Sequence, residues 1–146
     1  MTKEQLWKEY TVSNDINVCK YQAWAFGGDA DLLADLVLRG EKTATASAYR
    51  LYEIQNEPLP KVGEYSVILD SRQQAVCVIQ TTIVYIIPFC EVSEMHAYKE
   101  GEGNKTLTFW RNVHRVFFSE CLLEAGVAFD EEMKVVCEEF EVVYKR

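Results

Sequence analysis

The segment from Gly40 to Thr45 constrains the fold more than any other part of this sequence. It follows residues 32–39, whose leucines and valine recur at helical spacing. Glycine adopts the left-handed conformation that ends helices at low steric cost, so we expect this helix to stop at Gly40. The next residues, Lys-Thr-Ala-Thr, favour the first strand of a sheet. The sequence therefore predicts a sharp reversal from helix to strand, with Lys42 at the corner.

Apolar periodicity predicts helices and strands in an order that lacks a regular βαβ repeat. Residues 11–28 have no clear period, and residues 71–74 form a polar turn that joins two strands as a hairpin. This order favours one α+β domain over residues 1–146, with a mostly antiparallel, partly closed sheet and flanking helices. The predicted helices are 2–10, 29–40, 46–55, 93–100 and 106–126. The later strands are 64–70, 75–80 and 133–143, and residues 81–87 continue as a long or bent strand that ends at Pro88.

Composition narrows the class of protein. The chain has 146 residues, 49% of them hydrophobic, which suits a single domain with a sizeable core. Its net charge of −8 disfavours a general nucleic-acid coat, although a local basic pocket is compatible with it. The N-terminus lacks a signal pattern and no apolar run reaches membrane-spanning length, so we expect a soluble, cytoplasmic protein.

Several kinds of site are excluded by residue counts and spacing. The five cysteines are scattered without CxxC spacing, which argues against a disulfide framework and a structural zinc site. His96 and His114 are the only histidines, so a multi-histidine metal site is excluded. The sequence also lacks a P-loop, a GxGxxG motif and a GxSxG elbow. We therefore expect no metal and no cofactor.

The first candidate group is Lys42, Thr43 and Thr45. A lysine near a hydroxyl positions it, or acts as its base where the ammonium pKa is lowered. Residues three apart on a strand point to opposite faces, so Lys42 can meet Thr45 only if it lies before the strand. The alternative is a lysine favoured by the helix dipole, followed by ordinary strand threonines.

Two further groups lie near the fourth and fifth predicted helices. Glu100 and Glu102 alternate with glycines at a helix end, where a carboxylate can act as general acid or base and glycines permit close approach of a ligand. The alternative is a polar loop. Trp110 and His114 share the apolar face of the last helix, flanked by Arg111 and Arg115. They could stack a base and hold a phosphate, or simply belong to the core.

Together these segments resemble the ASCH domain, a β-barrel family related to the PUA RNA-binding fold. The resemblance runs from about residue 25 to residue 146, and the long tryptophan-histidine-phenylalanine helix is similar to a longer bacterial subgroup of the family. It is carried by the G-x-K-T-x-T motif at 40–45 and by segments 60–65, 89–92, 97–101, 110–118 and 136–143.

The resemblance implies a cleft at the barrel mouth that binds RNA or a modified nucleoside or nucleotide. One short bacterial branch hydrolyses the acetyl amide of acetylcytidine, and its lysine, threonine and glutamate match Lys42, Thr45 and Glu100. On this analogy Thr45 is the nucleophile, Lys42 its activator and Glu100 the proton carrier. The predicted ligand-binding residues around them are Thr43, Arg50, Glu102, Trp110, Arg111 and His114.

The alternative function is a non-catalytic RNA-binding module. It would hold phosphates with Lys42, Arg50, Arg111 and Arg115, and stack bases on Trp110 or Tyr49. A ribonuclease version would use Lys42 to stabilise the scissile phosphate.

Overall fold

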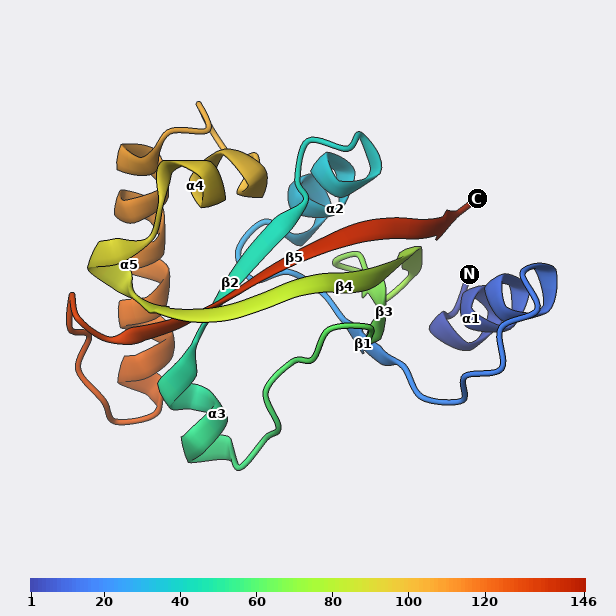
Figure 1. The fold of residues 1–146 in the computed structure, drawn as a ribbon, viewed down its shortest axis with the longest axis horizontal. Coiled ribbons are helices and arrows are strands. Elements are labelled where there is room, and N and C mark those ends of the chain that lie inside the picture. Colours follow the sequence, from blue (N-terminus) through green and yellow to red (C-terminus); the bar gives the residue numbers. More distant parts are fainter.

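The computed structural model describes residues 1–146 and centres on a curled five-stranded sheet (Figure 1). The strand order is β1-β3-β4-β5-β2, and all neighbours are antiparallel except β1 and β3. The predicted α+β fold with a mostly antiparallel, partly closed sheet is confirmed. The strands are β1 (Gln22–Trp24), β2 (Ala44–Ala48), β3 (Tyr65–Leu69), β4 (Ala75–Pro88) and β5 (Lys134–Lys145).

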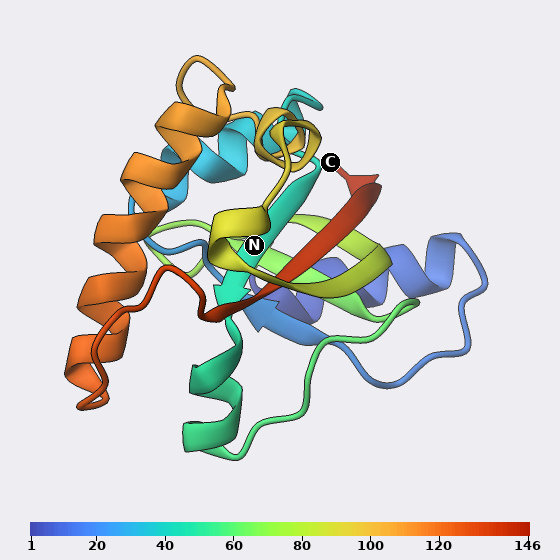
Figure 2. The same ribbon diagram turned by 60° about the vertical axis from the view of Figure 1, so that its left-hand side comes forward.

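Helices flank this sheet at both ends. Figure 1 shows α4 and α5 at one end of the long strands β4 and β5, and α1 at the other end. The turned view in Figure 2 shows α5 along the side of the sheet, with α3 below β2. The helices are α1 (Lys3–Ser13), α2 (Ala30–Leu38), α3 (Tyr49–Gln55), α4 (Glu94–Glu100) and α5 (Leu107–Glu124), with a short 3-10 turn η1 (Phe89–Glu91).

Side chains cap the starts of the first two helices. Thr2 and Gln5 form a capping box at α1, and the Asp29 carboxylate accepts a hydrogen bond from the Leu32 amide at the start of α2. The predicted short helix at 46–55 begins too early, because residues 46–48 pair with β5 and only Tyr49 starts α3. The predicted long or bent continuation of strand 75–80 through 81–87 is present as the single strand β4, which has register shifts along its length.

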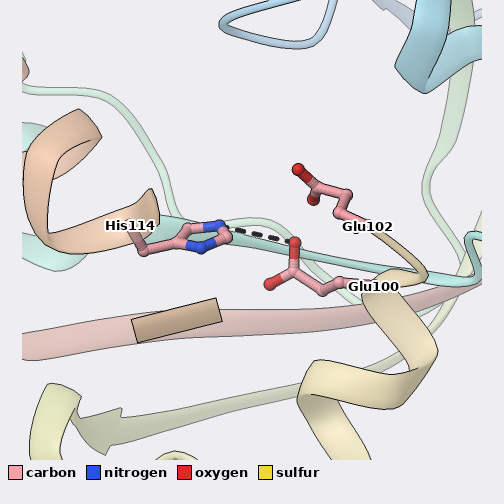
Figure 3. Close-up of side chains that lie close together, drawn as sticks. All are labelled: Glu100, Glu102 and His114. Carbon is pink, nitrogen blue, oxygen red and sulfur yellow. Dashed lines mark ion pairs between the residues drawn. The ribbon is translucent and has the colours of Figure 1, made fainter. Parts of the chain in front are cut away.

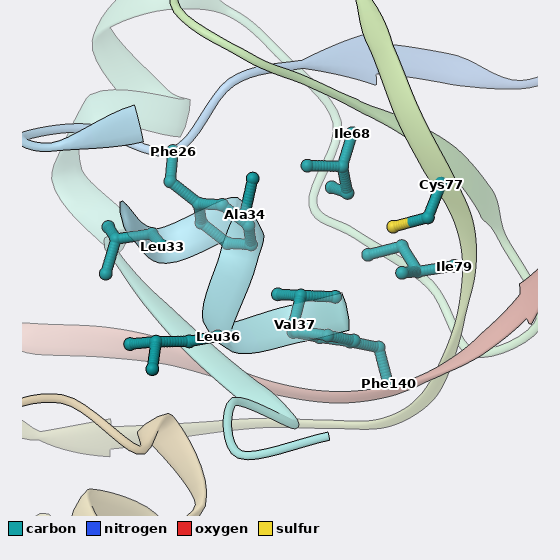
Figure 4. Close-up of a cluster of buried hydrophobic side chains, with 9 residues drawn as sticks. All are labelled: Phe26, Leu33, Ala34, Leu36, Val37, Ile68, Cys77, Ile79 and Phe140. Carbon is teal, nitrogen blue, oxygen red and sulfur yellow. The ribbon is translucent and has the colours of Figure 1, made fainter. Parts of the chain in front are cut away.

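Three apolar clusters hold the layers together. In the first, α2 packs on the sheet through Leu33, Ala34, Leu36 and Val37 (Figure 4). The second joins α4 and α5 to the opposite face around Phe89, Trp110 and Phe118, and the third places α1 on β3 and β4. The helix α2, the pair α4 and α5, and the helix α1 thus cover three parts of the sheet, which is shared by all three clusters.

The two edge strands of the sheet are β1 and β2. Strand β1 lies inside residues 11–28, where the sequence showed no period. A strand of three residues is too short to give a recognisable alternation of apolar and polar side chains. No helix of the structure is long and apolar enough to span a bilayer. All five cysteines are free.

Candidate active site

The corner after α2 has the predicted geometry. Gly40 has a φ of +75°, and the amides of Glu41 and Lys42 both donate to the Leu36 carbonyl at 3.0 and 3.1 Å. Strand β2 begins only at Ala44, so Lys42 lies before the strand. The Thr43 amide then donates to the Lys99 carbonyl at 2.7 Å, which ties the corner to the end of α4. This tie brings two segments far apart in the sequence into contact.

Lys42 is buried between two carboxylates. Its Nζ lies 3.1 Å from Glu100 Oε1 and 3.0 Å from Glu102 Oε2, and the residue is only 2% exposed. The same ammonium lies over the Phe26 ring, 5.2 Å from its centroid. The structure therefore brings together the lysine of the corner and the acids of the later loop, as the resemblance implies.

Every side of the Glu100 carboxylate is occupied. Besides Lys42, it meets His96 Nε2 at 2.7 Å and Trp110 Nε1 at 2.5 Å, both at Oε2. His114 Nε2 lies 3.6 Å from Oε1; Figure 3 shows this ring directed from α5 toward the end of α4. Burial raises the pKa of Glu100, but the Lys42 charge and the two histidines outweigh it, so the pKa lies well below its ordinary value. Glu100 thus stays ionised.

His114 is held in one orientation. Its ring stacks on the Trp110 ring at 4.2 Å between centroids, and its Nδ1 lies 2.9 Å from the Trp110 carbonyl oxygen. That contact requires Nδ1 to be the donor, which leaves Nε2 toward Glu100. Burial lowers the pKa of His114, but contact with the Glu100 carboxylate raises it more, so the net pKa is raised. His114 therefore titrates above the ordinary histidine value.

Glu100, Glu102 and His114 also have the donor set of a small metal site, with ligand atoms within 4.8 Å of one another. Lys42 Nζ, however, lies about 3 Å from both carboxylates. An ammonium in this position supplies the positive charge that a cation would bring, so it competes directly with metal binding. The geometry favours a lysine-centred site.

A cavity of about 230 Å³, which we call the lysine cavity, opens beside these groups. Its lining includes Lys42, Thr45, Glu102 and His114. No protein group hydrogen-bonds the Thr45 hydroxyl, whereas the Thr43 hydroxyl donates to the Lys99 carbonyl at 3.4 Å. Thr45 is thus the free hydroxyl of the G-x-K-T-x-T motif.

The other predicted ligand-binding residues do not line the lysine cavity. Trp110 is 2% exposed, so it supports Glu100 and has no free face for a base. Arg111 donates to the Cys90 carbonyl at 2.9 Å, Arg115 pairs with Glu131 and Arg50 pairs with Glu53. The arginines therefore do not form a basic track beside Lys42.

Three neighbours of the site were not among the predicted site residues. His96 binds Glu100, and its spacing of four residues within α4 was the available signal. Phe26 and Phe117 line the lysine cavity, and the Phe117 ring packs so closely on Gly27 that a Cβ there would lie 2.5 Å from it. Their packing depends on tertiary contacts, for which the sequence carries no local signal.

Comparison with known proteins identifies the family. The ASCH domain model matches residues 22–144. The chain belongs to the ASCH domain family. A crystal structure of an ASCH domain from Lactobacillus crispatus JV V101 is 36% identical, with a TM-score of 0.91 over 97% of this chain and 93% of that one. Protein EF3133 from Enterococcus faecalis V583 is 37% identical, with a TM-score of 0.90 over 96% and 86%.

More distant ASCH structures share the fold alone. The ASCH protein from Zymomonas mobilis is 10% identical, with a TM-score of 0.52 over 86% of this chain and 70% of that one. No curated protein matches the sequence. The ASCH domain has a PUA-like fold, which is often linked to RNA binding.

Proposed function

We propose that this ASCH domain binds a nucleoside-type ligand at the lysine cavity and hydrolyses an amide of that ligand, as in acetylcytidine. The observation that carries the proposal is the free Thr45 hydroxyl in the same cavity as the buried Lys42 ammonium. A hydroxyl nucleophile needs a group that stabilises the developing oxyanion and a group that moves protons. The cavity lining supplies both.

The proposed reaction starts with attack of Thr45 Oγ1 on the amide carbonyl. The hydroxyl proton passes to a base, a threonyl ester forms, and the C–N bond breaks as the amine leaves with a proton. Water then hydrolyses the ester and frees Thr45. Lys42 is held as an ammonium by two carboxylates and is suited to stabilise the oxyanion.

The contacts of Glu100 favour a positioning role over proton transfer. Its lowered pKa makes it a poor proton donor near neutral pH, and its oxygens are already occupied. His114 and Glu102 line the cavity as Glu100 does, but the raised pKa of His114 and the greater exposure of the Glu102 side chain, 18% against 1% for Glu100, suit this pair better to moving the proton. We therefore assign the proton-transfer step to this pair and assign Glu100 to orienting Lys42 and His114.

The charge distribution favours a small, uncharged ligand over a long polyanion. Lys42 is the only lysine or arginine in the lining, and two glutamates flank it. Phosphate tracking by Arg50, Arg111 and Arg115 would need these residues beside the cavity, and their ion pairs and hydrogen bonds hold them elsewhere. An RNA ligand would accordingly be engaged through one unpaired nucleotide.

The test compares two neighbouring threonines. Acetylcytidine, other acylated nucleosides and short RNAs are incubated with the protein, and products are identified by mass spectrometry. Thr45→Ala should lower amide hydrolysis by roughly 10³-fold or more, as loss of a nucleophile does in hydrolases. Thr43→Ala is the matched control and should retain most activity, because Thr43 does not line the cavity. Equal turnover by wild type and Thr45→Ala would overturn the proposed nucleophile.

A further inference from the structure

A second, larger cavity lies between the two edge strands. We call it the seam cavity; its volume is about 750 Å³, and residues of both β1 and β2 line it. Ligand sites commonly occupy about 300–1,000 Å³, so the seam cavity is in that range and the lysine cavity is below it. A nucleoside with its ring and sugar therefore needs more room than the lysine cavity provides.

The two cavities meet at shared walls. Thr45 belongs to both linings, and so do Phe26, Gly27, Ala46 and Phe117. A ligand with its scissile amide at Thr45 would extend into the seam cavity. There it would meet the aromatic side chains of Trp24, Phe26 and Phe117, which offer stacking surfaces for a flat ring.

The polar side of the seam cavity is acidic. Glu57, Glu64 and Glu138 line it, together with Ser66 and Thr81, and no lysine, arginine or histidine does. Glu138 lies directly across from Thr45 in the β2–β5 register, so the two side chains emerge on the same face. It makes no ion pair, in contrast to Glu100. A ligand group at Thr45 would thus be next to an uncompensated carboxyl.

Burial and the nearby Glu64 charge raise the pKa of Glu138 to about 7, against a hydrogen bond from Thr81. At or below neutral pH much of this carboxyl is protonated. A protonated carboxyl offers one O–H donor beside one carbonyl acceptor. The other titratable groups that face it are Glu57, Glu64, Tyr52 and Cys121. Burial moves the pKa of Tyr52 and of Cys121 upward, away from neutrality.

We propose that the seam cavity holds the heterocyclic ring of the ligand, and that protonated Glu138 pairs with a ring edge that combines one N–H donor with one lone-pair acceptor. The amino group and N3 of cytosine form such an edge. The assignment rests on the proposed function, since it takes the ligand to be a nucleoside. This proposal assigns the seam cavity as the site of the ring, and assigns Glu138, opposite Thr45, as the residue that recognises the ring by hydrogen bonds.

The test is the pH dependence of cytidine binding, measured by calorimetry from pH 5.5 to 8.5. Wild-type affinity should fall about tenfold per pH unit above pH 7, because the binding form of Glu138 loses its proton. Glu138→Gln should keep the affinity seen at low pH and lose the pH dependence of this step, since an amide offers the same donor and acceptor pair. Glu138→Leu should lose at least tenfold. Glu141→Gln, an exposed glutamate of β5, is the matched control.

The outcomes separate the two proposals. If affinity rises with pH and Glu138→Gln loses binding, the ionised Glu138 carboxylate accepts hydrogen bonds from ligand donors only, and this inference is overturned. Tight binding of spermidine would identify a cation site and would overturn it as well. Cytidine binding unchanged in Glu138→Leu would place the ring elsewhere and leave the Thr45 chemistry intact. Absence of binding by cytidine and absence of hydrolysis together would reject both proposals. Thermal melts confirm that each variant is folded.

Discussion

Two glutamates that line the cavities of this ASCH domain, the buried Glu100 and the half-buried Glu138, differ in the charges around them. Glu100, at the end of α4, meets the Lys42 ammonium, two histidines and the Trp110 indole N–H. Glu138, on β5, has a hydrogen bond from Thr81 and repulsion from Glu64. The pKa of Glu100 is well below its ordinary value, whereas that of Glu138 is raised to about 7.

The difference shows that burial by itself does not fix the charge of a carboxyl. Burial penalises the ionised form of both residues, and only Glu100 has an adjacent ammonium to offset the penalty. Glu100 therefore keeps its negative charge around neutral pH, while the charge of Glu138 changes there.

The largest expected effect comes from removing the Lys42 ammonium. Lys42→Met would leave Glu100 buried without its main counter-charge, at a cost of roughly 3–5 kcal/mol in the free energy of unfolding. Denaturant unfolding at pH 7 measures this loss. The pKa of Glu100 is lowered in the folded state. The stabilisation that ionised Glu100 contributes to the folded protein is therefore fully present above the unfolded-state pKa of this residue, and it is lost as pH falls through the folded-state pKa.

The matched control is Lys99→Met. Lys99 pairs with Glu139 at 2.8 Å, but their side chains are 34% and 20% exposed. A solvated pair of this kind contributes about 1 kcal/mol or less. If Lys42→Met and Lys99→Met cost the same, the contrast between a compensated buried acid and an ordinary ion pair would be wrong.

A smaller effect, of opposite sign, is expected at Glu138. Its folded-state pKa is raised from 4.5 to about 7, so wild-type stability should decline as pH rises from about 4.5 to 7 and level off above that. Glu138→Gln avoids this loss of stability, because the glutamine amide does not ionise. The variant should match wild type at pH 4 and be more stable at pH 8.5 by up to about 3 kcal/mol. Thermal or urea unfolding across this pH range checks it, and no gain at pH 8.5 would contradict the raised pKa.

The smallest effect concerns the wall between the two cavities. In Gly27→Ala the new Cβ would lie 2.5 Å from Phe117 Cζ, so the ring must move. Overpacking of this kind costs about 1–3 kcal/mol. The double variant Gly27→Ala with Phe117→Leu should recover part of the loss, as a double-mutant cycle of unfolding free energies would show. Additive losses would mean that the ring does not contact Gly27 as described.

Much of this fold is determined by residues that are close to one another in the sequence. The helix stop at Gly40, the Thr2 and Asp29 caps and the β3–β4 hairpin all depend on residues close to one another in the chain. The match of Lys42, Thr45 and Glu100 to a family motif also led to the lysine cavity. The sequence did not predict strand β1, because this strand is short and becomes a strand only by pairing with β3.

Roles within the site were harder to predict. Trp110 and His114 were correctly placed on one face of α5, but the sequence could not show that Trp110 is buried and binds Glu100 with its N–H. Arg111 donates to the Cys90 carbonyl and Arg115 pairs with Glu131, so the arginines beside them make local contacts and do not form a basic track.

The sequence by itself determined where the chain bends and which polar residues stand at the bends, since helix ends, caps and strand alternation are set by near neighbours. The tertiary structure alone decided which acids are charged. The corner of Lys42 and the loop of Glu100 meet through a contact across 58 residues, while Glu138 lies across from Thr45 through strand pairing without any cation. Charge compensation acts through space, so it exists only once the sheet and α4 have brought these residues together.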